Sequence, residues 1–315
     1  MTQQSYKIFI DGQAGTTGLQ INERLKTHER VEVLEIAPED RKNLDKKKLL
    51  MQEADVTFLC LPDDAAKEAA ILAKEAGSRV IDASSAHRCA PGWVYGLAEL
   101  NADQRAAIKN AQFVANPGCY ATGAILLLAP LVQNGVLSAD SLISIAGVSG
   151  YSGGGNALIT DYEEGDNPSS FAMYGLGLDH KHIPEIVKWA GLNNRPTFIP
   201  AVANIKQGMF VYFTLDQKTL SKPLKNIPEV YQSAYKGEQT VVFDETCLNF
   251  QERFKYIEGI ANQNVCQISS FLSEEHGQAL VVAKLDNLGK GASGAAVQNM
   301  NIMLGLPENM GSTLA

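Results

Sequence analysis

The chain has 315 residues and a mass of 34.0 kDa, so we expect two domains or one large α/β unit. Its hydrophobic share of 45% and charged share of 20% are ordinary for a globular protein and exclude a disordered or fibrous chain. A net charge of -8 argues against nucleic acids and anionic membranes as partners, because the overall field repels them.

The N-terminal segment and the cysteines indicate the compartment. MTQQSYKIFIDG lacks the basic region, the long apolar stretch and the cleavage site of a signal peptide. The longest apolar stretch, from Ala124 to Val132, is interrupted by Pro130 and is too short to span a membrane. Five cysteines form an odd set without CxxC spacing, which predicts neither a disulfide framework nor a metal site. We therefore expect a cytoplasmic protein without a bound metal.

The first part of the chain alternates predicted strands with predicted helices. Helices are expected from Leu19 to His28 and from Asp63 to Gly77, where the glycine ends the second one. Strands are expected at Tyr6–Ile10, Val31–Ala37, Ala54–Leu61 and Arg79–Ala83. This alternation predicts right-handed crossovers and a doubly wound parallel sheet of the Rossmann type. A run of three lysines at Lys46–Lys48 is interpreted as a solvated helix face.

The pattern changes after Asn116. A helix is expected from Thr122 to Asn134, followed by glycine-rich loops and by alternating strands at Met209–Leu215 and Gln278–Leu285. This half is predicted to be α+β with a mixed or antiparallel sheet. The last segment, GASGAAVQNMNIMLGL, offers apolar faces with which a helix could pack back on the first domain.

A glycine-rich turn, GQAGTTG, joins the first strand to the first helix. Gly12, Gly15 and Gly18 lack a Cβ, which lets the backbone approach a pyrophosphate while helix N-terminal amides hold its charge. Thr16 and Thr17 add hydroxyl donors. The structural alternative is a tight turn with close helix packing, but the position after the first strand of a βαβ series favours dinucleotide binding.

The end of the second strand bears on which dinucleotide binds. An NAD site usually has an acidic residue there for the ribose hydroxyls, whereas this strand is expected to continue into Ala37 and Pro38. Arg41 or Lys42 could pair with a 2′-phosphate, which favours NADP over NAD. The alternative for both residues is an exposed helix start.

Cys119 is the candidate nucleophile. It follows Asn116-Pro117-Gly118 and opens an apolar helix, where helix-end amides stabilise a thiolate and lower the thiol pKa. The alternative is a small buried hydrophobe, which is our interpretation of Cys60. Cys89, Cys247 and Cys266 lack such a turn before a helix and are interpreted as structural or exposed.

Two histidines are the candidate proton-transfer partners of the thiol. His180 and His182 stand in LDHKHIPEI, one residue apart, and an extended segment would point them to opposite faces. One is expected to meet the thiol and the other to orient the substrate, against the alternatives of a surface loop or half a metal site. Glu185 could orient an imidazole.

Six motifs together resemble the N-acetyl-γ-glutamyl-phosphate reductases of arginine biosynthesis, in their shorter type 2 form. The resemblance spans the chain, and NPGCYAT and HKHIPEI in this order are its specific part. The motifs are GQAGTTG at Gly12–Gly18, DASSAHR at Asp82–Arg88, NPGCYAT at Asn116–Thr122, GVSGYSGGG at Gly147–Gly155, HKHIPEI at His180–Ile186 and GKGASGAAVQNMN at Gly289–Asn301.

This resemblance implies a domain plan shared with aspartate-semialdehyde dehydrogenase and, more distantly, glyceraldehyde-3-phosphate dehydrogenase. Residues 1–117 and 290–315 would form the NADP-binding domain, and residues 118–289 the catalytic and dimerisation domain. The enzyme would form homodimers or homotetramers. Its partner would be a small acyl phosphate, with no nucleic acid or membrane.

The reaction implied by the resemblance is reduction of an acyl phosphate through a thioester. Cys119 would attack the acyl carbon and expel phosphate, and NADPH would deliver hydride. We favour His182 as the acid/base and His180 as its support, although the sequence leaves their order open.

Further residues are expected to bind substrate or cofactor. Candidates for the substrate are Ser85, Arg88, Asn116, Ser149, Gly150 and Tyr151, and for the cofactor, besides the glycine loop and Arg41, they are Ser84, Gly291 and Ser293. Arg88 could clamp a phosphate or carboxylate, or could instead form a surface or hinge salt bridge. The run from Ser149 could close over the acyl chain, or be a plain loop.

Three other functions stay open. An aspartate-semialdehyde dehydrogenase-like enzyme would act on another acyl phosphate, but the HKHIPEI segment disfavours it. A dinucleotide-binding sensor without catalysis would need only the glycine loop. A thiol hydrolase or acyltransferase would use Cys119 and a histidine without a nicotinamide.

Overall fold

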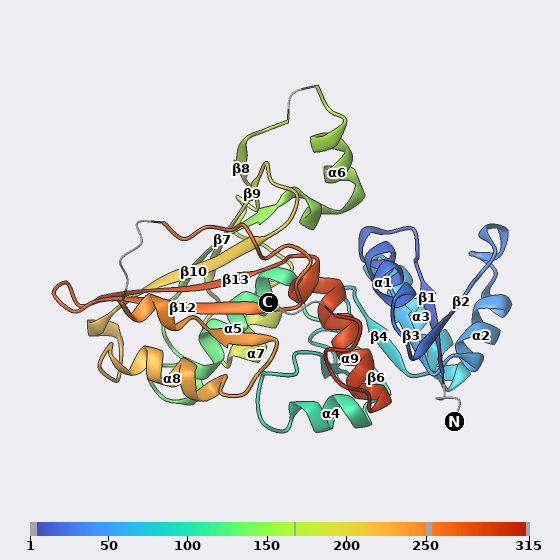
Figure 1. Ribbon diagram of the computed structural model, residues 1–315, viewed down its shortest axis with the longest axis horizontal. Coiled ribbons are helices and arrows are strands. Elements are labelled where there is room, and N and C mark those ends of the chain that lie inside the picture. The colour runs from blue at the N-terminus through green and yellow to red at the C-terminus, as the bar shows by residue number, and fades with distance from the viewer. Residues whose placement is uncertain (1–4, 167, 250–253, 313–315) are drawn as a thin grey trace. The chain divides into compact units, whose positions relative to one another are not determined.

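The computed structural model describes residues 5–166, 168–249 and 254–312 of the chain (Figure 1). They divide into two compact units. The residues up to Gly118 and those from Ala292 onward form the first unit, and Cys119–Gly291 form the second. The outer ends of the predicted first domain, residues 1–4 and 313–315, lie outside the described residues.

The first unit is built on a six-stranded parallel sheet in the order β2-β1-β3-β4-β6-β5. Its strands are β1 (Tyr6–Asp11), β2 (Val31–Leu34), β3 (Val56–Leu59), β4 (Val80–Asp82), β5 (Val94–Tyr95) and β6 (Phe113–Ala115). Because β2 and β3 flank β1 on opposite sides, the strand order reverses at β1. In open α/β sheets, ligands bind at such a reversal, beyond the carboxyl ends of the strands.

Helices cover both faces of this sheet. They are α1 (Thr16–Lys26), α2 (Leu44–Glu53), α3 (Asp63–Ala76), α4 (Gln104–Asn110) and α9 (Gly294–Leu304). Since side chains alternate along a strand, Ile8 and Ile10 of β1 face one cluster and Phe9 faces the other. α1, α4 and α9 contribute to the first cluster, and α2 and α3 to the second.

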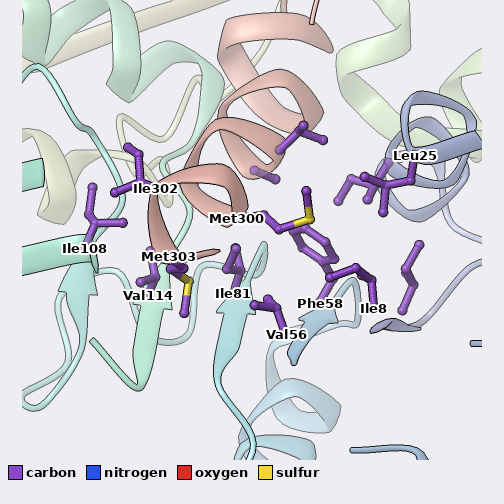
Figure 2. Packing of buried hydrophobic residues seen from close by; sticks show 14 of the residues in the cluster. Ile8, Leu25, Val56, Phe58, Ile81, Ile108, Val114, Met300, Ile302 and Met303 are labelled. Atoms are coloured by element: carbon purple, nitrogen blue, oxygen red, sulfur yellow. The ribbon is translucent and has the colours of Figure 1, made fainter. Parts of the chain in front are cut away.

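The C-terminal helix α9 completes the core of the first unit. Figure 2 shows Met300, Ile302 and Met303 of α9 among side chains of the sheet, including Phe58 and Ile81. Ten of the eleven residues of α9, all but Leu304, are buried, which explains its small and apolar sequence. The expected return of the last segment to the first part of the chain is therefore found.

Local signals located β1 to β4, α1, α3 and α9 of this unit, but they missed β5, β6 and α4 and misplaced several element ends. Gly77 ends α3 in the left-handed conformation, with φ 72°. β2 stops at Leu34 instead of Ala37, because its register with β1 runs only from Val31 to Leu34 before the glycine loop diverges. α1 begins at Thr16, three residues before the predicted start.

The interpretation of Lys46–Lys48 as a solvated face is wrong for Lys47. Its ammonium pairs with the buried carboxylate of Asp11 at 2.8 Å, and its side chain is only 14% exposed. Lys48 pairs with Glu75 at the surface, and Lys46 is exposed. The sequence could not reveal the Lys47 contact because α2 and β1 are separated along the chain.

The second unit holds a mixed seven-stranded sheet in the order β11-β12-β13-β10-β7-β9-β8. Its strands are β7 (Ser144–Gly150), β8 (Phe171–Met173), β9 (Thr197–Ala203), β10 (Met209–Asp216), β11 (Val241–Phe243), β12 (Cys266–Ser273) and β13 (Gln278–Leu285). Its helices are α5 (Cys119–Gln133), α6 (Gly155–Glu163), α7 (Ile183–Ala190) and α8 (Asn226–Ala234). A parallel sheet in one unit and a mixed sheet in the other confirm the predicted fold class.

α5 packs between this sheet and the helices α7 and α8. It is apolar on all sides and begins at Cys119, three residues before its predicted start. The alternation along β10 places Met209, Val211 and Phe213 in the core, while Phe210 and Tyr212 on the opposite face are only partly buried.

Candidate active site

The glycine loop follows β1 at the strand-order reversal, and its three glycines differ in what surrounds them. Gly12 has φ +95°, and a Cβ there would lie 2.2 Å from the carbonyl oxygen of Cys60. A Cβ on Gly18 would lie 2.3 Å from the Gly12 oxygen. These two glycines are required by the turn and by the contact between helix and loop.

Gly15 is not required by the protein's own packing. Its φ of -77° is open to any residue, and a Cβ would meet nothing closer than 3.7 Å. It is the N-cap of α1, it brings no capping side chain, and no acidic residue stands in the first turn. The space before Gly15 and the N-terminus of α1 therefore fit a pyrophosphate, with Thr16 and Thr17 in the first turn.

The residue predicted to bind the 2′-phosphate, Arg41, lies on the loop after β2. Arg41 follows a short 3₁₀ turn, Pro38–Asp40, and is exposed to solvent. Lys42 is exposed as well. Both cations are available to an anionic ligand.

The loop after β4, which carries DASSAHR, is organised around the buried carboxylate of Asp82. Asp82 accepts hydrogen bonds from the backbone N–H and the hydroxyl of Ser84, at 2.9 and 2.6 Å. The Nδ1 atom of His87 lies 2.6 Å from the same carboxylate, and the ring stacks on Trp93 with centroids 4.0 Å apart. Sequence analysis left His87 without a role, although it stands inside the motif.

Ser85 and Arg88 of this loop are also held by protein groups. Ser85 donates its N–H and its hydroxyl to Asp63, the first residue of α3. Arg88 is 8% exposed and donates to the backbone carbonyls of Asn116 and Ala83, at 3.0 and 3.2 Å. Arg88 therefore braces the ends of β4 and β6, a role that the sequence did not suggest.

Asn116 and Ser293 are buried where α9 joins the first unit. The Asn116 amide donates to the carbonyl of Ala292 and accepts from the amide of Asn299. The Ser293 hydroxyl accepts from Arg24 at 2.9 Å. Both polar groups bind protein partners, which fixes the start of α9.

The second unit brings together the proposed nucleophile and the histidines. Cys119 is the first residue of α5 and is partly exposed, so its sulfur is near the N-terminal amides of a long helix. Burial instead raises the pKa of the Cys60 thiol, and the carboxylates of Asp82 and Asp11 add to this effect. Such a thiol is a poor nucleophile, which agrees with a structural role for Cys60.

Tyr120 links the nucleophile helix to the histidines. Its ring is buried against Gly147, where a Cβ would lie 2.4 Å from a ring carbon, and its hydroxyl donates to Ala201 at 2.7 Å. The rings of His180 and His182 have centroids 6.0 and 6.2 Å from the Tyr120 ring. Sequence analysis did not single out Tyr120, although it directly follows the cysteine.

The two histidines do not point to opposite faces, as an extended segment would require. Their rings meet edge to face with centroids 4.7 Å apart. The reason is that α7 begins at Ile183, so the chain turns at His182, and the N–H of Ile183 bonds to the carbonyl of His180. The N–H of His182 donates to Nδ1 of His180 at 3.2 Å, so a neutral His180 carries its proton on Nε2.

Glu185 lies one turn into α7, beneath His182. Its Oε1 is 3.9 Å from Nε2 of His182, and both side chains are almost fully buried. The i, i+3 spacing on the helix produces this approach. A carboxylate in that position favours the imidazolium form of His182.

Tyr174 is a further group at this site that sequence analysis missed. Burial raises its pKa to about 12, and the charge of the nearby Cys119 adds to this effect. Its phenol therefore keeps its proton near neutral pH and can donate a hydrogen bond. Its ring centroid is 5.9 Å from that of His180. No sequence signal marks Tyr174, because it follows a short edge strand.

Two loops of the second unit carry further predicted residues, and one of them contacts Cys119. Gly291 lies against it, since a Cβ on Gly291 would be 2.8 Å from the Cβ of Cys119. Ser149 and Gly150 end β7, and the Ser149 hydroxyl donates to the Gly150 carbonyl at 3.0 Å. Tyr151 stacks on Tyr162, and its hydroxyl donates to Glu163.

Comparisons with known proteins agree with this arrangement. Residues 7–110 match the NAD-binding domain of semialdehyde dehydrogenases, and residues 119–287 match their dimerisation domain. An N-acetyl-γ-glutamyl-phosphate reductase of Trichormus variabilis is 46% identical over 97% of this chain and 98% of its own length. One from Brucella suis is 46% identical over 95% and 99%. The chain belongs to the N-acetyl-γ-glutamyl-phosphate reductase family.

Membership of the reductase family confirms the resemblance drawn from the six motifs and makes the chain an NAD(P)-binding oxidoreductase. A Nostoc relative, also 46% identical, is named N-acetyl-γ-glutamyl-phosphate reductase 2. Aspartate semialdehyde dehydrogenase II of Vibrio cholerae shares the fold at a TM-score of 0.70, with 15% identity over 96% of this chain and 98% of its own. The Candida albicans aspartate semialdehyde dehydrogenase, with 14% identity over 96% and 99%, has a TM-score of 0.64 and was crystallised with NADP.

Within residues 5–166, 168–249 and 254–312, no group of three or more histidine, cysteine or acidic side chains is arranged to hold a metal ion. No helix in that part of the chain is long and apolar enough to cross a membrane.

Proposed function

We propose that this chain reduces N-acetyl-γ-glutamyl phosphate with NADPH to N-acetylglutamate 5-semialdehyde and phosphate, in arginine biosynthesis. The observation that carries the proposal is Cys119 at the start of α5, in the same unit as a pair of histidines packed on Tyr120. The identity of 46% with reductases over nearly the whole chain supports the choice of substrate.

Cys119 begins the reaction. Its thiolate attacks the acyl carbon, a C–S bond forms, and the C–O bond to phosphate breaks, so that inorganic phosphate leaves and a thioester remains. The amides at the start of α5 stabilise the thiolate before attack and the oxyanion during it.

The first unit provides the cofactor site. Bound NADPH supplies the hydride that reduces the thioester carbon. Gly15, Thr16 and Thr17 would hold the pyrophosphate at the N-terminus of α1, and the exposed Arg41 would pair with the 2′-phosphate. Ser84, Gly291 and Ser293 remain part of the proposed cofactor set. The NADP bound to the Candida albicans neighbour supports NADP over NAD.

His182 carries the proton in this proposal. Reduction of the thioester leaves a tetrahedral oxyanion, which His182 protonates to a hemithioacetal. The imidazole then takes the hydroxyl proton back as the C–S bond breaks, so that the aldehyde and the Cys119 thiolate are released. Glu185, 3.9 Å from Nε2, stabilises the imidazolium that serves as the acid. His180 supports it, because its Nδ1 accepts the backbone N–H of His182 and fixes the turn.

Two loops carry the proposed substrate residues. Ser85 and Arg88 stand on the loop after β4, and they would act on the substrate by holding this loop in place, because Ser85 donates to Asp63 and Arg88 donates to backbone carbonyls. Ser149, Gly150 and Tyr151 would contact the acyl chain. Asn116 acts on the site by fixing the start of α9, since its amide binds Ala292 and Asn299.

The sequence-based domain roles form part of the proposal. Residues 1–117 with 290–315 bind NADP, and residues 118–289 carry catalysis and dimerisation, as the two matched domain families support. The face of the second sheet with the partly exposed Phe210, Tyr212 and Phe271 would hold the second copy. We propose a homodimer, with a tetramer as the larger alternative. Five free thiols suit a reducing cytoplasm.

Replacement of the nucleophile tests the proposal. Cys119→Ser should abolish phosphate-dependent NADP⁺ reduction with N-acetylglutamate 5-semialdehyde and leave NADPH binding intact, while Cys89→Ser should retain turnover. Aspartate semialdehyde in the same assay separates the related dehydrogenase activity. Full turnover in the Cys119 variant would show the thioester mechanism to be wrong, and failure of the wild type to bind NADPH would favour a thiol hydrolase.

A further inference from the structure

A short turn holds Gly291 against the nucleophile. Gly289–Ser293 form a π-helical turn, in which the N–H of Gly291 bonds to the carbonyl of Asp286 at 2.9 Å. A Cβ on Gly291 would lie 2.8 Å from Cβ and 3.2 Å from Cα of Cys119. π-helical turns are rare and concentrate at functional sites. The position of this turn therefore sets what packs beside the thiol.

The turn is anchored by the buried carboxylate of Asp286. Its Oδ2 accepts from the N–H of Asn262 at 2.6 Å and from the amide of Gln207 at 3.3 Å. Its Oδ1 accepts from the N–H of Leu288 at 3.1 Å. Asp286 is fully buried, so these bonds are shielded from water. Asp286, whose carbonyl accepts the hydrogen bond from Gly291, is thus held in place by its own side chain.

The next residue, Asn287, binds a different part of the unit. Its Oδ1 accepts from the N–H of Gly208 and its Nδ2 donates to Oγ of Ser152, both at 2.9 Å. Ser152 donates its own hydroxyl proton to the carbonyl of Lys206 at 2.6 Å. Asn287 is 2% exposed, and its side chain uses both a donor and an acceptor.

Ser152 belongs to the loop that would contact the acyl chain. The loop is fixed to residues 205–208, because the N–H groups of Gly150 and Tyr151 bond to the carbonyls of Gly208 and Ile205. A Cβ on Gly153 would lie 3.1 Å from the Ser149 hydroxyl. The loop is therefore closely packed as well as hydrogen-bonded.

We propose that Asn287 is a positioning residue that couples the substrate loop at Ser149–Gly154 to the turn packed on Cys119. Its side chain fixes the loop through Ser152 and Gly208, and its backbone neighbour Asp286 fixes Gly291. Both ends of the Asn287 amide bind protein groups, Gly208 and Ser152, so we assign it to positioning and not to the chemistry. This inference rests on the proposed function for the role of the loop.

The amide chemistry of Asn287 makes the proposal specific. In Asn287→Asp the group facing Ser152 becomes an acceptor, and Ser152 has no second proton to donate, because its proton goes to Lys206. In Asn287→Ala both bonds are lost but no charge is buried. Asn287→Asp should therefore be impaired at least as strongly as Asn287→Ala.

The experiment compares these variants with a matched control. Tyr231→Phe also removes one buried hydrogen bond in the same unit, to the carbonyl of Leu127, two turns along α5 from Cys119. We measure kcat and KM, the pH profile of Cys119 alkylation by iodoacetamide, and NADPH affinity. Alkylation needs no substrate, so it reports on the thiol even if the proposed reaction is wrong.

We expect Asn287→Ala and Asn287→Asp to lower kcat by about tenfold to a hundredfold, the size of loss that a small misplacement causes. Their alkylation profiles should move to higher pH, since the helix-end amides then stabilise the thiolate less, and NADPH affinity should stay the same. If kcat and the alkylation profiles of the Asn287 variants equal those of Tyr231→Phe, the proposal is overturned.

Ser152→Ala provides a second test, which remains available if the Asn287 variants fail to fold. It deletes the loop end of the coupling and leaves Asn287 in place. We expect lower kcat and, where both single variants fold, a non-additive effect when it is combined with Asn287→Ala. A wild-type kcat in Ser152→Ala overturns the proposal, and a wild-type enzyme inactive on the acyl substrate instead overturns the proposed function.

Discussion

Gly15 and Gly18 stand three residues apart in the same loop, yet their replacement by alanine should have opposite effects. At Gly15 a methyl group meets nothing within 3.7 Å, and φ is -77°. Alanine restricts the unfolded chain by about 0.4–1 kcal/mol, and its poorer N-cap preference offsets this gain, so Gly15→Ala should change stability by less than about 0.5 kcal/mol. At Gly18 the methyl would lie 2.3 Å from the Gly12 oxygen. This clash should cost about 1–3 kcal/mol.

NADPH binding, in contrast to stability, should be weakened more by Gly15→Ala than by Gly18→Ala. The methyl of Gly15→Ala occupies the space through which a pyrophosphate approaches the N-terminal amides of α1. Loss of one hydrogen bond to a charged group costs about 1.5–3 kcal/mol, which corresponds to a rise in the NADPH Kd of about tenfold to a hundredfold. Cys119 chemistry should be unaffected, so alkylation of the free enzyme should match the wild type.

Two assays measure these effects. Urea unfolding gives the stability of each variant, and NADPH fluorescence titration gives the Kd. A Gly15→Ala protein that binds NADPH as tightly as the wild type would refute the placement of the pyrophosphate. A Gly15→Ala protein destabilised as strongly as Gly18→Ala would refute the packing argument.

Three further predictions concern single side chains. Lys47→Ala removes the ammonium that pairs with the buried Asp11 carboxylate and should lower the free energy of unfolding by about 3 kcal/mol. Lys46→Ala, at an exposed site, should change it by less than about 0.5 kcal/mol. Equal urea midpoints for the two variants would contradict this. Burial raises the pKa of Tyr231 above its usual value of about 10, so the stability it contributes is complete below about pH 10 and is lost as pH rises toward the folded-state pKa. Tyr231→Phe should reduce this alkaline loss in unfolding measured between about pH 8 and pH 11, and an unchanged slope would assign the loss to other groups. Glu185→Gln removes the carboxylate beside His182, so the limb of the kcat profile that reports His182 should move to lower pH. A limb that persists in His182→Asn would assign it to another group.

The sequence predicted those elements whose conformation is determined by contacts between neighbouring residues. The strand, glycine turn and helix at Tyr6–Lys26 follow from neighbouring residues, so they could be predicted. The turn at His180–His182 could not, because it depends on α7 beginning at Ile183 and on both rings packing against Tyr120.

Long-range contacts limited the prediction of the site in the same way. Arg88 has the chemistry of an anion ligand, and nothing beside it in the sequence shows that its guanidinium binds the carbonyls of Ala83 and Asn116. Tyr174 acquires its raised pKa from burial in the folded unit. Motif spacing identifies which residues gather, while their hydrogen bonds depend on the assembled fold.

The place of α9 in the core has a consequence for how this protein is made. The part of the first unit up to Gly118 is synthesised before Cys119–Gly291, yet Met300 and Met303, which fill its core, leave the ribosome only after that segment. At about 5–20 residues per second, the intervening Cys119–Gly291 segment takes roughly ten to thirty seconds to translate. During that interval the cluster around Phe58 and Ile81 lacks the side chains that α9 contributes to it. A nascent chain would therefore depend on chaperones at this cluster, and a ribosome stalled before Gly294 would release a cofactor domain that cannot close its core.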